Sequence, residues 1–271
     1  MRTGLAKLAL LAATFPCAVF AVDGVVLLDH AKALAGNITP GDAPGYPITI
    51  SQPGSYRLDG NLIVPDVNTD GIDITADNVT IDLNGFSIIG PNVCTIRVTF
   101  GIPGLTCTPG GSTGRGTGIL GHNGTMIRNG TIRGMGAVGI SLSTGVIEDI
   151  HSSSNGGYGI LVDGPAIVKN CTVELNLTGL GMGTGLATNI VAANNQYIGV
   201  VLSLGRLLGS TVINNGTGLY SPAISGGAAV FSRSFFGGNQ QDFGPSSSPP
   251  LNAGENICGG VPCPGFYGTV Q

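Results

Sequence analysis

Seven side chains that could take part in acid–base chemistry or bind a charged ligand lie in the middle of the chain. They are Asp82, Arg128, Arg133, Glu148, His151, Lys169 and Glu174. Carboxylates and histidine can serve as general acids or bases, and Arg and Lys pair with carboxylates. Arg128, Glu148 and Lys169 follow one another at intervals of about 20 residues. Whether these groups can act together depends on the element that repeats at that interval.

A repeat of about 20 residues runs through the centre of the chain. A glycine followed by an apolar residue recurs at Gly118, Gly139, Gly159, Gly179 and Gly199. Segments this short, rich in Val, Ile and Thr and separated by Gly and Asn, are typical of strands and turns. A coil of this length cannot bury a core alone, so each coil must stack on the next. The sequence therefore predicts an all-β fold, a single-stranded right-handed parallel β-helix with about 20 residues per coil.

Two columns of polar turn residues follow the same period. One contains Asn129, Asp149, Asn170 and Asn189, and the other contains Asn155, Asn176, Asn195 and Asn215. Asn tolerates the left-handed backbone of a tight turn, and stacked Asn side chains can hydrogen-bond from coil to coil. We expect structural ladders here, with Asn129 and Asn170 inaccessible. Cys171 falls between Ile150 and Ile190 in an inward column, which predicts a buried core thiol.

The seven charged or titratable side chains fall in outward columns of the predicted coil, where successive coils lie about 4.8 Å apart. One interpretation is a solvated face held together by cross-strand ion pairs. The other is a groove for an anionic or neutral glycan, in which Arg and Lys meet carboxylates and the other polar groups meet hydroxyls. Beyond residue 180 the same columns turn apolar at Val191, Leu208 and Ile213. We expect the C-terminal segment to cover them.

The composition narrows the class of protein. The chain of 271 residues has 47 Gly, only 10% charged residues and a net charge of -4, unlike a disordered or nucleic-acid-binding protein. Residues 1–21 place Arg2 and Lys7 around the start of a short apolar run that ends in small residues, the pattern of a cleavable signal peptide. No segment is apolar over the roughly 20 residues that a membrane helix needs. We expect a secreted, periplasmic or cell-surface protein.

The remaining segments flank or interrupt the coil. Residues 22–44 are expected to form an N-terminal cap, because Val25 to Ala35 has helical spacing. The coil then spans residues 45–239, and residues 240–271 lack the period. We expect that last segment to be a tail anchored on the coil by Phe243, Phe266 or Tyr267.

The cysteines predict two disulfides, because an exported protein can keep them. Residues 91–116 interrupt the period and are expected to form a loop extruded from one coil, bracketed by Cys94 and Cys107. Cys258 and Cys263 bracket a C-terminal turn.

Two segments near the start of the coil resemble a known family. "ITISQPGSYRLDGNLIVP" and "TADNVTIDLNGFSIIGP" are similar to the opening coils of bacterial β-helix-repeat proteins in the pectate-lyase-like superfamily. The resemblance covers roughly residues 45 to 240 and implies the fold. Many members of the superfamily are exported bacterial proteins that act on or bind polysaccharides. Lyases, hydrolases, epimerases and pure binders share this fold, so the resemblance does not imply one activity.

A short motif, Asn68-Thr69-Asp70, looks like the acid motif of the polygalacturonases. In that family a Gly-Asp-Asp segment follows one coil later, then Gly-His-Gly and Arg-Ile-Lys segments. Here Gly90-Pro91-Asn92 stands at the second position, the third is matched only in part and the fourth is absent. An inverting hydrolase needs two carboxylates roughly 6.5 to 9.5 Å apart, and Asp70 lacks such a partner. Asp82 and Glu148, two coils apart, are the stacked pair nearest to that separation.

The sequence thus predicts an exported, non-catalytic β-helix that binds a polysaccharide or serves as a cell-surface structural module, with the seven side chains as its binding surface. The alternative is a carbohydrate-active enzyme that uses Glu148, His151 and Lys169. It would be a polysaccharide lyase or epimerase, which needs a base and cations for the substrate carboxylate, or a polygalacturonase-like hydrolase. We expect no cofactor, no metal site, no nucleic-acid partner and no membrane span. The sequence does not indicate an oligomeric state.

Overall fold

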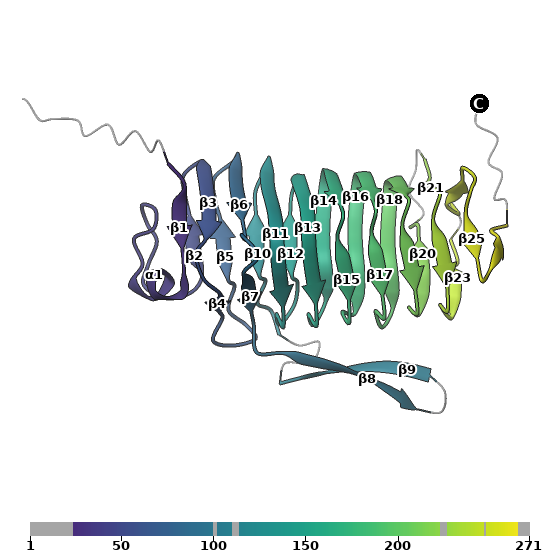
Figure 1. Ribbon diagram of the computed structural model, residues 1–271, viewed down its shortest axis with the longest axis horizontal. Coiled ribbons are helices and arrows are strands. Elements are labelled where there is room, and N and C mark those ends of the chain that lie inside the picture. Colours follow the sequence, from purple (N-terminus) through teal and green to yellow (C-terminus); the bar gives the residue numbers. More distant parts are fainter. Residues whose placement is uncertain (1–23, 100–101, 110–113, 223–226, 247, 265–271) are drawn as a thin grey trace, which may run out of the picture.

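The protein is nearly all β-structure and coils into a long solenoid (Figure 1). The computed structural model describes residues 24–99, 102–109, 114–222, 227–246 and 248–264. They form a parallel β-solenoid of about 9 turns with one short helix, which confirms the predicted right-handed parallel β-helix. Within these ranges no helix is long and apolar enough to span a bilayer. The predicted signal peptide, residues 1–21, lies outside the described residues.

The strands stack in three columns of parallel strands, which we name the first, second and third columns. The first contains β2 (Ile48–Ile50), β5 (Ile72–Ile74), β10 (Ile119–Gly121), β12 (Ile140–Leu142), the first parts of β14 (Tyr158–Lys169), β16 (Thr178–Thr188) and β18 (Ile198–Leu208), then β20 (Thr217–Tyr220) and β23 (Gln241–Phe243). The second contains β1 (Val26–Leu28), β3 (Gly54–Leu58), β6 (Val79–Asp82), the first parts of β11 (Thr125–Arg133) and β13 (Gly145–Ser153), the last parts of β14, β16 and β18, then β21 (Val230–Ser232) and β24 (Leu251–Asn252). The third contains β4 (Leu62–Ile63), β7 (Ser87–Ile89), the last parts of β11 and β13, β15 (Thr172–Glu174), β17 (Val191–Ala193), β19 (Thr211–Ile213), β22 (Phe235–Gly237) and β25 (Ile257–Cys258).

Stacked apolar side chains fill the interior of the coil. In the first column Ile48, Ile72, Ile119, Ile140 and Ile160 lie in register, and all five are fully buried. Burying each such side chain contributes about 1.5 to 3 kcal/mol. Because alternate residues of a strand point to opposite faces, the residues between these isoleucines are free to form the outer surface.

Left-handed residues turn the chain between the second and third columns, at what we call the second–third corner. Asn129, Asp149, Asn170 and Asn189 all have positive φ here, at 60°, 54°, 55° and 52°. Nδ2 of Asn170 donates to Asp149 Oδ1 at 3.1 Å, and Nδ2 of Asn189 donates to Asn170 Oδ1 at 3.1 Å. Asn129 donates instead to Asp82 Oδ1 at 3.3 Å. The expectation that Asn129 and Asn170 are inaccessible is wrong, because the corner turns both side chains toward solvent.

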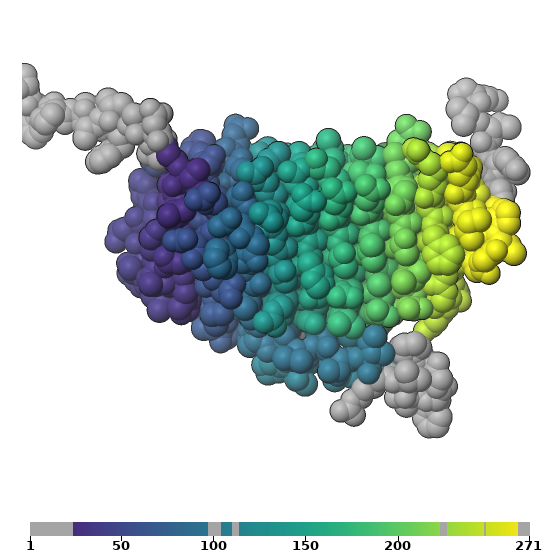
Figure 2. Space-filling model, in the orientation of Figure 1, coloured from purple at the N-terminus to yellow at the C-terminus, as the bar shows by residue number. Residues whose placement is uncertain are grey.

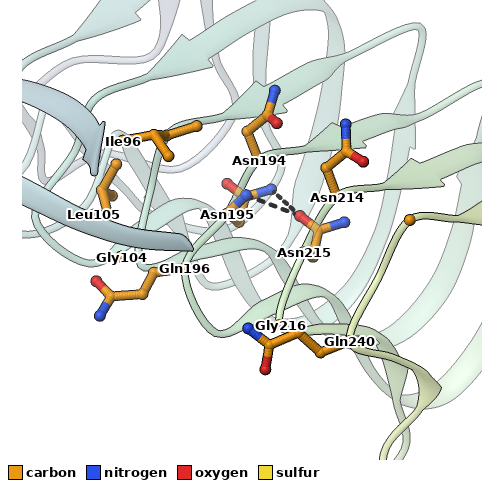
Figure 3. A pocket seen from close by; sticks show the side chains of 11 residues that line it. Ile96, Gly104, Leu105, Asn194, Asn195, Gln196, Asn214, Asn215, Gly216 and Gln240 are labelled. Atoms are coloured by element: carbon orange, nitrogen blue, oxygen red, sulfur yellow. Dashed lines mark hydrogen bonds between the residues drawn. The ribbon is translucent and has the colours of Figure 1, made fainter. Parts of the chain in front are cut away.

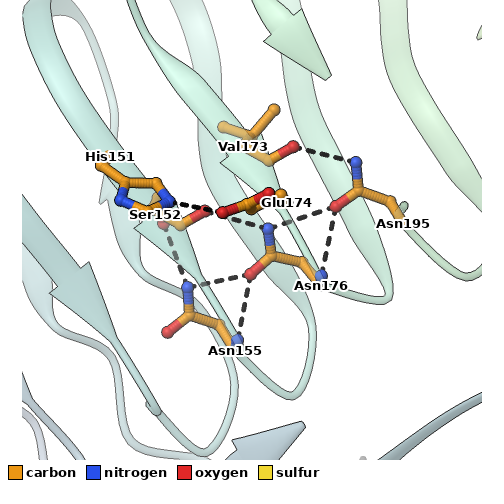
Figure 4. A network of polar contacts seen from close by, with 7 residues as sticks. All are labelled: His151, Ser152, Asn155, Val173, Glu174, Asn176 and Asn195. Atoms are coloured by element: carbon orange, nitrogen blue, oxygen red, sulfur yellow. Dashed lines mark hydrogen bonds and ion pairs between the residues drawn. The ribbon is translucent and has the colours of Figure 1, made fainter. Parts of the chain in front are cut away.

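A second ladder fixes the corner between the third and first columns, the third–first corner. Asn155, Asn176, Asn195 and Asn215 are buried, and Asn239 extends the ladder by one coil. The side-chain oxygen of Asn176 accepts from both the backbone N–H and the side-chain amide of Asn155, each at 3.0 Å (Figure 4). The same two bonds recur in each later coil. Each buried amide therefore has partners above and below.

Residues 91–116, expected as an extruded loop, contain a β-hairpin. β8 (Val93–Thr99) pairs antiparallel with β9 (Ile102–Thr108), and the Cys94–Cys107 disulfide that we predicted joins the two strands. The alternation of Thr with Val and Ile in this segment favours strands over an irregular loop. The hairpin leaves the third–first corner after β7 and extends along the later coils, against which it lies in the space-filling view (Figures 1 and 2).

The N-terminal cap is part strand and part helix. Helix α1 covers only His30–Ala35, whereas Val26–Leu28 forms β1 and pairs with β3. The predicted helix from Val25 is therefore too long, because Val26 and Leu28 extend the second column over the core. Asp29 begins the helix by accepting a hydrogen bond from the backbone N–H of Lys32 at 2.8 Å.

At the other end the coil continues into the segment that we expected to be a tail. β23, β24 and β25 stack on β20, β21 and β22, and β26 (Val261–Pro262) folds back antiparallel on β25. The predicted Cys258–Cys263 disulfide closes this turn, and Phe243 packs against Phe231 and Phe236. Phe266 and Tyr267 lie outside the described residues. We expected the C-terminal segment to cover Val191. That expectation is wrong, because the side chain is 38% exposed.

Candidate functional site

The charged side chains of the second column lie in the register that the repeat predicts. Arg128 is opposite Asp82 on one side and Glu148 on the other, and Glu148 is opposite Lys169. Nη2 of Arg128 lies 3.1 Å from Asp82 Oδ2, and Nζ of Lys169 lies 2.6 Å from Glu148 Oε2. The hydrogen bond to Glu148 raises the pKa of Lys169. Within this charged column, defined as Asp82, Arg128, Glu148 and Lys169, each cation therefore has a carboxylate partner.

The other three predicted site residues lie beyond the second–third corner, in the third column. Nε2 of His151 lies 2.9 Å from Oε1 of Glu174 (Figure 4). Arg133 is two coils from Glu174, with Ser153 between them. His151 is thus paired with Glu174 rather than with Glu148 or Lys169. The structure divides the seven residues between two columns on either side of a turn.

The acid motif near the start of the coil makes local and coil-to-coil contacts. Asp66 accepts from the Asn68 backbone N–H at 2.7 Å and from the Thr69 hydroxyl at 2.8 Å. Asp70 accepts from the backbone N–H of Thr117, one coil further on. Burial raises the pKa of the Asp70 carboxyl, and the hydrogen bond from Thr117 opposes that shift. These contacts give the motif a role in joining coils.

A pocket of about 230 Å³ lies between the hairpin and the third–first corner of the later coils (Figure 3). It is lined by Ile96, Gly104, Leu105, Asn194, Asn195, Gln196, Asn214, Asn215, Gly216, Gly238 and Gln240. A more open hollow of about 300 Å³ shares Gln196, Gly216 and Gln240 and adds Tyr197, Ile198, Thr217 and Gln241. We call the two together the amide groove. No charged side chain, and none of the seven predicted site residues, is among these lining residues.

Five amides of the groove have no hydrogen-bond partner among the residues that the structure describes. They are the side chains of Asn194, Gln196, Asn214, Gln240 and Gln241. The adjacent ladder residues Asn195 and Asn215 are bonded to each other, and the dashed lines in Figure 3 join only those two. An amide side chain carries two N–H donors and a carbonyl acceptor. The groove thus presents neutral donors and acceptors to whatever enters it.

The coil geometry sets where these amides point. Asn194 and Asn214 hold the same left-handed backbone, with φ of 55° and 56°, and project in the same direction from neighbouring coils (Figure 3). Gln196 and Gln240 lie on coils separated by the coil of Gly216. A side chain at Gly216 would meet the backbone oxygens of Gln196 and Tyr197 at 2.7 and 2.6 Å. Glycine is therefore needed for the close approach that forms this part of the groove.

The hairpin supplies an apolar wall opposite the amides. Ile96 and Leu105 are cross-strand partners in β8 and β9, and both line the pocket. At the open end of the groove, Tyr197 leaves 56% of its surface exposed. The site therefore combines free amides, an aliphatic wall and an exposed aromatic ring, a composition suited to an uncharged polar ligand.

The sequence indicated Asn195 and Asn215 as ladder residues but missed the groove beside them. The available signal was the column next to the ladder, where Asn194-Asn195-Gln196 and Asn214-Asn215-Gly216 carry further polar or small residues. The hairpin wall gave no such signal, because Ile96 and Leu105 lie far from these residues in the chain and outside the repeat.

The chain matches no family model, no curated protein and no solved structure. Among the described residues, no group of three or more His, Cys, Asp or Glu side chains is placed to hold a metal ion. Cys171 is the described cysteine without a disulfide; it is buried in the core, as predicted, and burial raises its pKa to about 12. A nucleophilic role for this thiol is therefore not supported.

Proposed function

We propose that this chain is an exported, non-catalytic member of the pectate-lyase-like β-helix proteins that binds a neutral polysaccharide in the amide groove. The observation that carries the proposal is the set of five amide side chains without partners among the described residues, at Asn194, Gln196, Asn214, Gln240 and Gln241. An unused donor and acceptor set beside a hollow is what a ligand rich in hydroxyl groups requires.

The chemistry of the lining favours a neutral glycan over an acidic one. A uronate carboxylate would lose water on entering the groove without meeting Arg or Lys, which is costly. A hydroxyl group both donates and accepts, so it can pair with either end of an amide. The exposed ring of Tyr197 offers a face on which a sugar ring can pack.

The same lining argues against catalysis in the groove, because it contains no carboxylate and no histidine to transfer a proton. One observation favours the enzyme alternative elsewhere on the molecule: the contact of 2.9 Å between His151 and Glu174, which are both partly exposed. A carboxylate that orients a histidine is a common arrangement for a general base. The second candidate function is therefore a polysaccharide lyase or epimerase acting at the third column.

A retention assay combined with a product assay tests the proposal. The exported chain is passed over neutral and uronate-containing polysaccharides, and the eluates are assayed for unsaturated products and new reducing ends. We expect retention on a neutral polysaccharide and no products. Product formation that His151→Ala abolishes would establish the enzyme alternative and contradict the proposal.

A further inference from the structure

The hairpin adds apolar side chains to the inner part of the amide groove, opposite the amides. Ile96 and Leu105 place aliphatic groups across from Asn194 and Asn214 (Figure 3). A glycan that carried only hydroxyl groups would satisfy the amides but would leave this aliphatic wall facing polar atoms. We therefore expect the sugar substituent that hydrogen-bonds to the amides to carry an apolar group as well, which contacts this wall.

The substituent must also be uncharged. A free amine would be cationic at neutral pH, and none of the described lining residues is a carboxylate that could pair with it. A carboxylate would be equally unpaired, because none of the described lining residues is Arg or Lys. An acetamido group meets all of these conditions: its C=O accepts, its N–H donates and its methyl group is apolar. Amide side chains are matched partners for both polar ends.

We infer that the amide groove binds N-acetylated hexosamine residues, with the acetamido group in the inner part between the hairpin and the two asparagines. This inference rests on the proposed glycan-binding function and names the class of sugar. The acetamido C=O and N–H pair with Asn194 and Asn214, and the methyl group contacts Leu105 and Ile96. The next sugar ring occupies the open end, against Tyr197 and between Gln196 and Gln240.

Three β-1,4-linked tetrasaccharides that differ only at C2 of each ring test the inference: one with acetamido groups, one with free amines and one with hydroxyls. Isothermal titration measures the dissociation constant of each with the exported chain at pH 7. We expect the acetamido tetrasaccharide to bind at least tenfold more tightly than the hydroxyl one. The amine tetrasaccharide should bind most weakly.

A hairpin variant with a matched control identifies the methyl contact. Leu105→Ala should weaken binding of the acetamido tetrasaccharide about tenfold and leave the hydroxyl one within twofold. Thr106→Ala, exposed on the opposite face of the same strand, should change neither. Because both residues lie on the hairpin, neither substitution removes a core side chain.

The outcomes separate this inference from the proposed function. Equal binding of the acetamido and hydroxyl tetrasaccharides overturns the inference and leaves neutral-glycan binding standing. Binding of none of the three, with retention on another neutral polysaccharide, also overturns the inference alone. Failure to bind any neutral glycan overturns both.

Discussion

The charged column and the amide groove are two outward surfaces of the same coil, and they differ in whether their side chains have partners. In the charged column the cations Arg128 and Lys169 are each held by a carboxylate of the adjacent coil. In the amide groove the side chains of Asn194 and Asn214 have no partner among the described residues. Regular stacking thus pairs each of these long charged side chains with an opposite charge one coil away.

The free amides are not a consequence of the turn itself. Asn170 and Asn189 at the second–third corner adopt the same left-handed backbone as Asn194 and Asn214, yet they hydrogen-bond to each other at 3.1 Å. The two corners therefore differ in side-chain partners and in cover, since only the third–first corner is faced by the hairpin in this region. A ladder residue and a groove-lining residue can therefore share one backbone conformation.

The largest effect is expected where a buried ladder amide is removed beneath the groove. Asn195→Ala removes the side-chain acceptor of the backbone N–H and of the side-chain amide of Asn176 in the interior, and the side-chain donor to the C=O of Val173. We expect the free energy of unfolding to fall by about 3 kcal/mol, since each buried polar group left without a partner costs about 1 to 3 kcal/mol. Denaturant titration measures this change.

The neighbouring residue provides the control for that prediction. Gln196→Ala removes an amide that bonds to no described residue, at a position without left-handed backbone, so the free energy of unfolding should change by less than about 0.5 kcal/mol. Equal losses in the two variants would contradict the distinction between ladder and groove.

The next effect is a loss of glycan affinity on removal of the hairpin disulfide. The double variant Cys94→Ser, Cys107→Ser removes the covalent link between β8 and β9, which in the loop-entropy description stabilises a segment of this size by about 3 kcal/mol. The wall formed by Ile96 and Leu105 should become less ordered, and the affinity for the glycan should fall about tenfold. The mutation should leave the coil folded, as circular dichroism can verify; unchanged affinity would show that the wall does not contribute to binding.

Asp70 accepts a hydrogen bond from a backbone N–H of the next coil, whereas the carboxylates of the charged column pair with cations. Because its pKa is raised in the folded state, the stability it contributes is present below its unfolded pKa and is lost as pH rises through its folded pKa. Asp70→Asn keeps an acceptor for Thr117 and carries no charge. We expect it to be more stable than the wild type at pH 7, by about 1 kcal/mol or less, and equally stable near pH 3. Thermal melts at the two pH values check this, and a variant that is less stable than the wild type at pH 7 would show that the ionised carboxylate stabilises the fold.

The smallest effect concerns the charged column itself. Arg128→Met removes one partly exposed ion pair with Asp82, and such pairs contribute about 0.2 to 1 kcal/mol. The difference in stability between the variant and the wild type should disappear in concentrated salt, because screening weakens the ion pair of the wild type. A larger loss that persists at high salt would mean that Arg128 stabilises the coil by packing.

The sequence predicted the parts of the molecule that repeat. Stacked residues such as Arg128, Glu148 and Lys169 were placed in register, because a fixed period converts sequence distance into spatial distance. The last coil was missed because its ladder residue Asn239 follows Asn215 by 24 residues, outside the period of about 20. The groove was missed because its hairpin wall comes from an insertion, whose direction over the later coils no local pattern encodes.

The most direct test of the account compares two double variants in one binding assay with a neutral polysaccharide. Gln196→Ala with Gln240→Ala removes two free amides from the groove, and Arg128→Ala with Lys169→Ala removes both cations of the charged column. We predict that the groove variant loses at least tenfold in affinity while the charged-column variant stays within twofold of the wild type. Retained affinity in the groove variant together with lost affinity in the charged-column variant would contradict the account and return the site to the charged column.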